Sequence, residues 1–236
     1  MSTHFIILAA GLGSRLGGSV PKPLTELEDG RTILQQQLSN IASVFGEEAL
    51  SRTTVVVGHR ADELRAVLPG SVSTVTNRHY RTTNTSKSLL LGLASLPSGS
   101  SALWLNGDVV FDAEILRKAL PLIEAESSFV VVNEGRTAEE EIKYRLDELG
   151  LISEISKTVR GGIGEAVGIN HVSTDSMLRF CLALESVELS DYFEAAMERT
   201  IQEGMGWIPL SAGSSYAVEV DFPEDLERAN SARSSL

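Results

Sequence analysis

The sequence predicts an α/β protein whose core is a doubly wound, mostly parallel sheet. Short apolar runs alternate along the chain with segments whose apolar residues recur at helical spacing. Several of these runs end in glycine or aspartate, as strands do where they leave a sheet for a loop. With 236 residues, 42% of them hydrophobic, the chain is long enough to bury the core of one large α/β domain. In such sheets, ligands bind beyond the carboxyl ends of the strands.

The first half of the chain carries the clearest alternation of elements. Apolar residues three or four positions apart, as at Leu34, Leu38 and Ile41, indicate a helix with one buried face. Short apolar or β-branched runs bounded by turn residues indicate strands. In chain order, these patterns predict strand 5–10, helix 32–45, strand 53–57, helix 61–67, strand 72–76, helix 86–96, strand 102–105, helix 113–125 and strand 128–132.

The second half is expected to add a small inserted lobe and to close the domain. The turn Glu148-Leu149-Gly150 separates two expected strands within residues 144–157, and a glycine-rich loop follows at 160–164. The remaining elements are predicted as strand 167–172, helices 173–183 and 190–203, strand 216–220 and helix 223–231. The sequence shows no internal repeat and no low-complexity linker, so we expect one domain over residues 1–236.

The charge of the chain excludes some classes of partner. A net charge of −12 and an isoelectric point near 4.8 argue against nucleic acid, because phosphate backbones are bound by basic surfaces. The sequence has no run of about 18 apolar residues, and its apolar N-terminal run lacks a basic leader. We therefore expect no membrane partner and a cytoplasmic location. The oligomeric state stays open, a homodimer included.

The first strand leads into the segment with the most chemical content. The sequence Leu8-Ala9-Ala10-Gly11-Leu12-Gly13-Ser14-Arg15-Leu16 is followed closely by Pro21-Lys22-Pro23-Leu24. Gly11 and Gly13 let backbone N–H groups approach phosphate oxygens, and Arg15 and Lys22 supply two local cations. Leu16 stands where a dinucleotide-binding fingerprint needs its third glycine, and Gly-Lys-Ser/Thr does not occur, so a dehydrogenase and a Walker-type site are disfavoured.

Two carboxylate segments are candidates for binding a metal ion. Asp108 ends an expected strand in Asn106-Gly107-Asp108, and alternation places Glu219 and Asp221 on one face of a later strand. Mg²⁺ is held by one or two carboxylates together with substrate oxygens, which suits Asp108, Asp221 and Glu219. Each segment also has a simpler interpretation. Asn-Gly-Asp is a common turn, and Asp221 has capping-box spacing to Glu224.

Five further side chains could contact a ligand, although each has an ordinary structural alternative. Asn84 and Ser88 lie where a helix opens and could face a base, a ribose or a phosphate, but simple capping of that helix by Thr85 or Ser86 explains the same pattern. The other three could bind a polar acceptor. The ordinary alternative is a solvated surface position for the two charged residues and a position in the core or a wall for the tyrosine. These three residues are Lys157, Glu165 and Tyr192.

Taken together, the two N-terminal segments resemble the signature of sugar-1-phosphate nucleotidylyltransferases and their relatives. The resemblance implies a Rossmann-like nucleotidyltransferase fold, with a nucleotide-binding part at about 1–132, an acceptor-binding lobe at about 133–215 and a closing metal-site strand and helix at 216–236. It implies that Leu8, Ala9, Ala10, Gly11 and Gly13 bind the nucleotide, beside Asn84 and Ser88. It also implies catalytic roles for Arg15 and Lys22, metal binding by Asp108, Asp221 and Glu219, and acceptor binding by Lys157, Glu165 and Tyr192.

Within that family, the chain looks most like the cytidylyltransferases of small alcohol phosphates. The segments that carry this likeness are Asn84-x-x-x-Ser88-Leu89, Gly164-Glu165-x-x-Gly168-Ile169, Asp191-Tyr192 and the ending Glu219-Val220-Asp221-Phe222-Pro223-Glu224-Asp225. The resemblance implies Mg²⁺-dependent transfer of CMP from CTP to a small phosphorylated alcohol or phosphonate, with release of pyrophosphate. A uridylyl-, guanylyl- or thymidylyltransferase acting on a sugar 1-phosphate and a non-catalytic nucleotide-binding module remain the alternatives.

Overall fold

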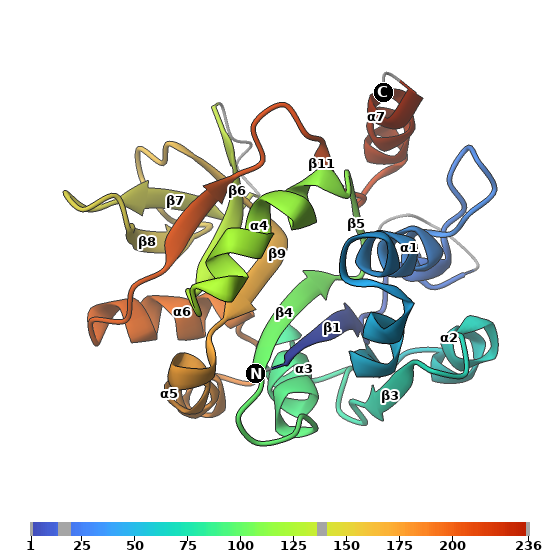
Figure 1. Cartoon of the computed structure of the whole chain (residues 1–236), viewed down its shortest axis with the longest axis horizontal. Helices are drawn as coiled ribbons and strands as arrows, with labels where there is room; N and C mark the ends of the chain where they lie inside the picture. The colour runs from blue at the N-terminus through green and yellow to red at the C-terminus, as the bar shows by residue number, and fades with distance from the viewer. Residues whose placement is uncertain (1, 14–19, 136–140, 235–236) are drawn as a thin grey trace.

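The fold, a computed structural model, is built on one large sheet with helices on both faces (Figure 1). The structure describes residues 2–13, 20–135 and 141–234. Seven strands of the nine-stranded sheet follow the spatial order β10-β6-β9-β4-β1-β2-β3. Their bounds are β1 Thr3–Ala9, β2 Thr53–Val57, β3 Ser73–Thr76, β4 Ser101–Asn106, β6 Phe129–Glu134, β9 Gly164–Val172 and β10 Ile208–Ser211.

The pairing of these strands confirms the predicted doubly wound, mostly parallel sheet. Strands β3, β2, β1 and β4 are parallel neighbours, and β10 is parallel to β6. Strand β9 is the exception, because it runs antiparallel between β4 and β6. The hairpin of β7 (Lys143–Leu146) and β8 (Ile152–Ser156) joins the sheet through β9 and forms the expected pair of strands around a turn.

Helices pack on the two faces of the sheet because successive strand residues point to opposite sides. Phe5 and Ile7 of β1 belong to one buried cluster with α1, α2 and α4, whereas Ile6 and Leu8 belong to another with α3, α5 and α6. The helix bounds are α1 Ile33–Phe45, α2 Ala61–Val67, α3 Thr85–Ala94, α4 Glu114–Glu124, α5 Thr174–Ser186, α6 Phe193–Gln202 and α7 Pro223–Ser234, with short 3-10 helices η2 at Lys22–Leu24 and η3 at Glu47–Arg52.

A second, two-stranded sheet lies apart from the main one and was not predicted in full. Strand β5 (Val109–Phe111) pairs antiparallel with β11 (Ala217–Glu219). The sequence pattern indicated the later strand but missed β5, because three residues after a turn form a strand only when a distant partner is available. Strand β10 was missed for the same reason. The ribbon joins the end of β4 to the C-terminal segment.

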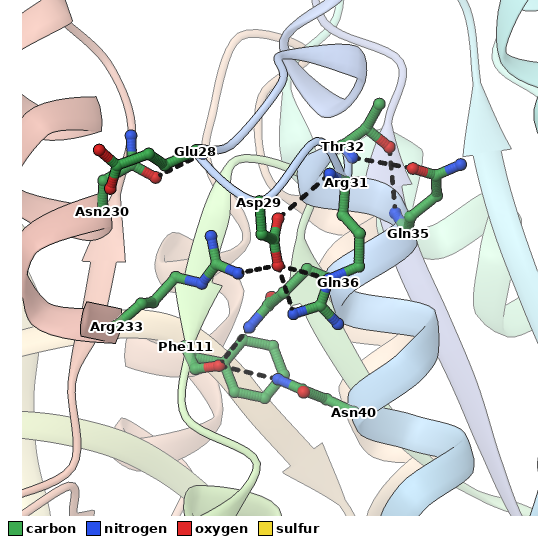
Figure 2. Close-up of polar contacts among 10 residues, drawn as sticks. All are labelled: Glu28, Asp29, Arg31, Thr32, Gln35, Gln36, Asn40, Phe111, Asn230 and Arg233. Atoms are coloured by element: carbon green, nitrogen blue, oxygen red, sulfur yellow. Dashed lines mark hydrogen bonds and ion pairs between the residues drawn. The ribbon is translucent and has the colours of Figure 1, made fainter. Parts of the chain in front are cut away.

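The C-terminal helix is fastened to the loop that precedes α1. Val220 and Ala229 are buried in a third cluster with Leu27, Ile33 and Val110. Figure 2 shows the polar contacts beside this cluster: the Glu28 N–H donates to Asn230 Oδ1 at 3.0 Å, and Arg233 forms an ion pair with Asp29. The C-terminal helix is therefore held against the loop before α1, and this loop packs beside Val110 of the ribbon.

None of the helices in the described ranges is long and apolar enough to cross a membrane.

Candidate active site

A cavity of about 590 Å³ opens at the carboxyl ends of β1 and β4. Its wall includes the first glycine loop, Lys22, the turn after β4, the end of β11 and the start of α6. This is the edge at which ligands are expected in a doubly wound sheet. Lys157, one of the predicted acceptor residues, lines the same cavity, so both halves of the chain contribute to it.

Lys22 lies at the centre of this site between two carboxylates. Its Nζ donates to Asp108 Oδ2 at 3.2 Å and also forms an ion pair with Asp221. Burial alone would lower the pKa of Lys22, but the charges of Asp108 and Asp221 outweigh burial and raise that pKa. The pKa of Asp108 is raised, first by burial and then by the charge of Asp221, with Lys22 acting in the opposite direction. Lys22 is therefore a fully charged ammonium at neutral pH.

Close backbone packing brings Asp108 and Asp221 to the same point. The Gly107 N–H donates to the Leu8 carbonyl at 2.9 Å, and a Cβ on Gly107 would lie only 2.5 Å from that oxygen. On the other side, the Val220 N–H donates to the Asp108 carbonyl at 2.9 Å, which continues the β5–β11 ribbon. The turn after β4 is thus held between β1 and the C-terminal segment, and only glycine fits the tighter of these contacts.

Glu219 lies beside these carboxylates and is held by an amide. Asn106 Nδ2 donates to Glu219 Oε1 at 2.9 Å. The pKa of Glu219 is raised well above its ordinary value, chiefly by burial and then by the charge of Asp108. Gly168, at a φ of +69°, packs against this pair, since a Cβ there would lie 2.7 Å from Glu219 Oε1. Glu219 therefore lies close enough to Asp108 for the charge of Asp108 to affect its pKa.

The carboxylates suit a magnesium ion held together with substrate oxygens. Asp108 and Asp221 both reach the Lys22 ammonium group, so their carboxylates face the same part of the cavity. No group of three or more His, Cys, Asp or Glu side chains in the described ranges forms a complete metal cage. Mg²⁺ does not need such a cage, because it is usually bound by one or two carboxylates, waters and phosphates. The residues present therefore fit this metal.

The structure places most of the predicted nucleotide-binding residues of the glycine loop at the cavity. Leu8, Ala9, Gly11 and Gly13 all line it. Gly13 has a φ of +61°, and a Cβ there would lie 3.0 Å from Lys22 Cγ, so the loop packs directly on the lysine stem. Ala10 is buried and absent from the wall, with its carbonyl accepting from the His59 N–H at 3.1 Å. Arg15, the second predicted catalytic cation, lies outside the described residues.

The two predicted residues at the start of α3 differ in placement. Asn84 lines the cavity and is itself the helix cap: its Oδ1 accepts from the Thr85 N–H, and its amide donates to the Ser190 carbonyl at 3.1 Å. The predicted cap, Thr85 or Ser86, therefore lies one or two residues beyond the actual cap, Asn84. Ser88 is buried behind the wall, where its hydroxyl accepts from Asn77 Nδ2 at 3.0 Å. The structure does not bring Ser88 to the cavity.

The three predicted acceptor residues are also divided. Lys157 and Tyr192 both line the cavity, with Lys157 Nζ 4.9 Å from the centre of the Tyr192 ring. Glu165 is not part of the wall, and its Oε1 accepts from Asn133 Nδ2 at 3.3 Å. The capping expectation for Asp221 needs correction as well. The acceptor for the Asp221 and Phe222 N–H groups is the carboxylate of Asp225, one residue beyond Glu224.

Sequence reasoning missed one residue of the wall with unusual properties. Glu194, in the first turn of α6, lines the cavity and is only 6% exposed. Burial raises the pKa of Glu194 to about 7, although Lys157 opposes the rise. Its position in a helix with a regular apolar stripe hides it, because a glutamate there normally faces water. The nearest sequence signal for a wall residue in this region was the Asp191-Tyr192 pair just before Glu194.

Comparisons with known proteins agree with the fold and place the protein in the nucleotidyltransferase class. The chain belongs to the family described as MobA-like NTP transferase domain, whose model matches residues 5–188. This match confirms the resemblance stated from the N-terminal motifs.

The proteins similar to the chain include one curated relative and two solved structures. A CMP-5'-(3-aminopropyl)phosphonate synthase from Streptomyces rubellomurinus is 36% identical over 128 residues, which are 51% of this chain and 19% of that protein. The chain thus spans about a fifth of the length of that relative. An inositol-1-phosphate CTP transferase from T. maritima has a TM-score of 0.77 at 18% identity, covering 99% of this chain and 97% of the other. A candidate glucose-1-phosphate thymidylyltransferase from Bacillus anthracis has a TM-score of 0.80 at 16% identity, covering 100% and 96%. These structures confirm the fold.

Proposed function

We propose that this protein is a Mg²⁺-dependent cytidylyltransferase that transfers CMP from CTP to a small phosphorylated alcohol or phosphonate. The observation that carries the proposal is the meeting of Lys22, Asp108 and Asp221 beside the Gly11–Gly13 loop. Binding of a nucleotide alone does not require two converging carboxylates, so a non-catalytic binding module explains the site less well. Phosphoryl-type transfer needs this combination, because charge has to be neutralised around the reacting phosphorus.

The proposed reaction is an in-line displacement at the α-phosphorus of CTP. An oxygen of the acceptor phosphate or phosphonate forms the new bond to phosphorus, and the bond to the oxygen that bridges to the β-phosphate breaks. Pyrophosphate leaves with the electron pair of that bond. The attacking oxygen is already anionic, so little general-base work is required, and catalysis rests on positioning and charge neutralisation.

The predicted site residues that line the cavity, together with Arg15 from the sequence motif, would have separate roles. Gly11 and Gly13 would offer backbone N–H groups to the triphosphate, and Lys22 would stabilise charge at the α-phosphate. Arg15 would stabilise the leaving pyrophosphate, Asn84 would contact the nucleotide, and Lys157 and Tyr192 would contact the acceptor. Asp108 and Asp221, with Glu219 beside them, would hold Mg²⁺, which supplies Lewis-acid stabilisation of the phosphate oxygens when bound. Ser88 and Glu165 lie behind or beside the wall, so we assign them no contact with substrate.

The preference for CTP is supported by the sequence relative and not by the fold. The relative at 36% identity carries CMP in its name, whereas the similar solved structures include both a CTP transferase and a candidate thymidylyltransferase. A sugar-1-phosphate nucleotidyltransferase is therefore the second candidate. Pyrophosphate release measured with each of four nucleoside triphosphates against a panel of phosphonates, alcohol phosphates and sugar 1-phosphates separates the two. Turnover confined to UTP, GTP or dTTP would overturn the cytidylyl assignment, and nucleotide binding without release would favour the binding module.

A further inference from the structure

The wall of the cavity holds three acids that the proposed chemistry does not use, Glu141, Glu194 and Asp225, and Glu194 is the buried one among them. Glu194 is almost fully buried, and its Oε2 has no hydrogen-bond partner among the residues that the structure describes. An unpartnered buried carboxylate is unfavourable, and a protein that keeps one in a binding cavity leaves it to be matched by a ligand. Its placement at the start of α6, two residues after Tyr192, puts it on the acceptor side of the cavity.

The charge balance of the wall indicates what that ligand group must be. The described lining carries six carboxylates and three cations, namely Asp108, Glu141, Glu194, Glu219, Asp221 and Asp225 against Lys22, Lys157 and Arg228. Lys22 is paired with two of these acids, and Arg228 donates to Asp225 at 2.8 Å. On the acceptor side, the charge of Lys157 acts on Glu194, while the charges of Glu194 and Glu141 both act on Glu219. An acceptor that brought only a phosphate would add negative charge to a wall that already has an excess.

We propose that Glu194 binds a protonated amine of the acceptor, so that the acceptor is a zwitterion with an ammonium group near its phosphate or phosphonate. This inference rests on the transferase function proposed above and deepens it. Lys157, whose Nζ lies over the Tyr192 ring, meets the anionic end of such a molecule, and Glu194 in the same cavity wall meets the cationic end. A hydroxyl group in place of the amine could donate one hydrogen bond, but it would leave the charge of a carboxylate that is almost fully buried without compensation.

The experiment compares acceptors that differ only in the amine. 3-Aminopropylphosphonate and propylphosphonate are each given with Mg²⁺ and CTP, and kcat/KM is measured as pyrophosphate release for wild type, Glu194→Gln and Glu198→Gln. Wild type should prefer the amine by about 100-fold, as expected when a buried charge pair loses one partner. Glu194→Gln keeps the size of the side chain and should bring the ratio of the two substrates close to one. Glu198→Gln, one turn further along α6 and outside the wall, should keep the wild-type ratio.

A second pair of phosphonates tests the same idea at a shorter spacing. 2-Aminoethylphosphonate and ethylphosphonate are included because the structure does not set the distance between the two charges. Equal turnover with and without the amine at both lengths overturns the role of Glu194 and leaves the transferase function standing. An unchanged amine preference in Glu194→Gln overturns it as well.

A binding measurement keeps the inference testable without turnover. Thermal melting is followed with each phosphonate added in the presence of CMP and Mg²⁺. The amine compound should raise the melting temperature of wild type more than its partner does, and Glu194→Gln should remove that difference. Absence of pyrophosphate release with every nucleotide and acceptor would overturn the transferase proposal, while the melting difference would still decide whether Glu194 binds an amine.

Discussion

At the scale of single residues, the site depends on one lysine that faces two aspartates from distant parts of the chain. Asp108 and Asp221 lie 86 and 199 residues from Lys22, yet both reach its ammonium group. Because that group is only 14% exposed, water screens the three charges weakly. Lys22 is therefore oriented before any substrate arrives, which is the condition for strong stabilisation of charge in a transition state.

Replacing Lys22 tests this preorganisation directly. Lys22→Ala should lower kcat for pyrophosphate release by about 100- to 1,000-fold, the usual cost of removing one charge-stabilising donor. Steady-state kinetics with Mg²⁺ and CTP provide the measurement. Arg117→Ala is the control, because Arg117 is half exposed on α4 and takes no part in the cavity. Near-native turnover in Lys22→Ala would refute the assignment.

Glu194 makes a prediction about stability that is independent of turnover. Its pKa is raised from 4.5 in the unfolded chain to about 7 in the fold, so the folded state favours the protonated form. The resulting penalty is absent below about pH 4.5, grows as pH rises, and is complete above about pH 7 at about 3 kcal/mol. Glu194→Gln should thus be more stable than wild type at pH 8 by up to that amount and equal to it at pH 4. Urea denaturation at both pH values measures the difference, and an equal gain at both would contradict it.

At the scale of elements, α1 supports the site through a row of buried amides. Gln37 Nε2 donates to the carbonyls of Asn106 and Val109, both at 2.8 Å, and so holds both ends of the turn that carries Asp108. Gln36, directly before Gln37, and Asn40, about one turn further along α1, both donate to the Phe111 carbonyl, as Figure 2 shows. An apolar helix face could cover the sheet equally well, but it could not satisfy these carbonyls.

Gln37 is therefore expected to position Asp108. Gln37→Met should cost about 2 kcal/mol of unfolding free energy, because two buried carbonyls lose a donor, and should lower kcat by about 10-fold through displacement of the turn. Gln36→Met is the matched control: Phe111 keeps its bond from Asn40, so stability falls less and activity is retained. Chemical denaturation and kinetics on the pair are the measurements. Equal kinetic losses in both variants would show that Gln37 has no special role.

At the scale of the whole molecule, the last segment of the chain completes the site without adding to the main sheet. Strand β11 pairs only with β5, and α7 packs through Ala229 against Val220 and the loop before α1. The ion pair of Asp29 and Arg233 fastens the far end of α7 (Figure 2). The segment therefore brings Glu219 and Asp221 to a cavity whose floor is formed by the first residues of the chain.

A shortened chain tests whether the last segment is needed for the site but not for the main sheet. A protein that ends at Ser215 keeps all nine strands of the main sheet but loses β11, Asp221 and α7. Far-ultraviolet circular dichroism should show that the sheet still forms, with stability reduced by several kcal/mol because Val110 and its neighbours become exposed. Pyrophosphate release should disappear. A shortened chain that is active, or one that does not fold, would each contradict this description.

Much of this fold is local enough to be predicted from the sequence. The strand at 53–57 and the helix at 61–67 coincide with β2 and α2, because a β-branched run and an apolar period act through neighbouring residues. Strands β5 and β10 were not predicted, since they exist through distant partners. Ser88 shows the same limit of local prediction for a single residue. It lies on the predicted helix, but its hydroxyl faces Asn77 and not the cavity.

The sequence by itself determined the fold class, the glycine loop with its lysine, and two carboxylate segments at strand ends. Each of these depends on spacing within about twenty residues, where backbone propensity and the partition of apolar side chains are sufficient. Only the tertiary structure decided that Lys22, Asp108 and Asp221 meet, that Glu165 stays out of the wall and that Glu194 enters it. The physical reason is that burial, register and charge environment belong to contacts between distant segments, which no local pattern encodes.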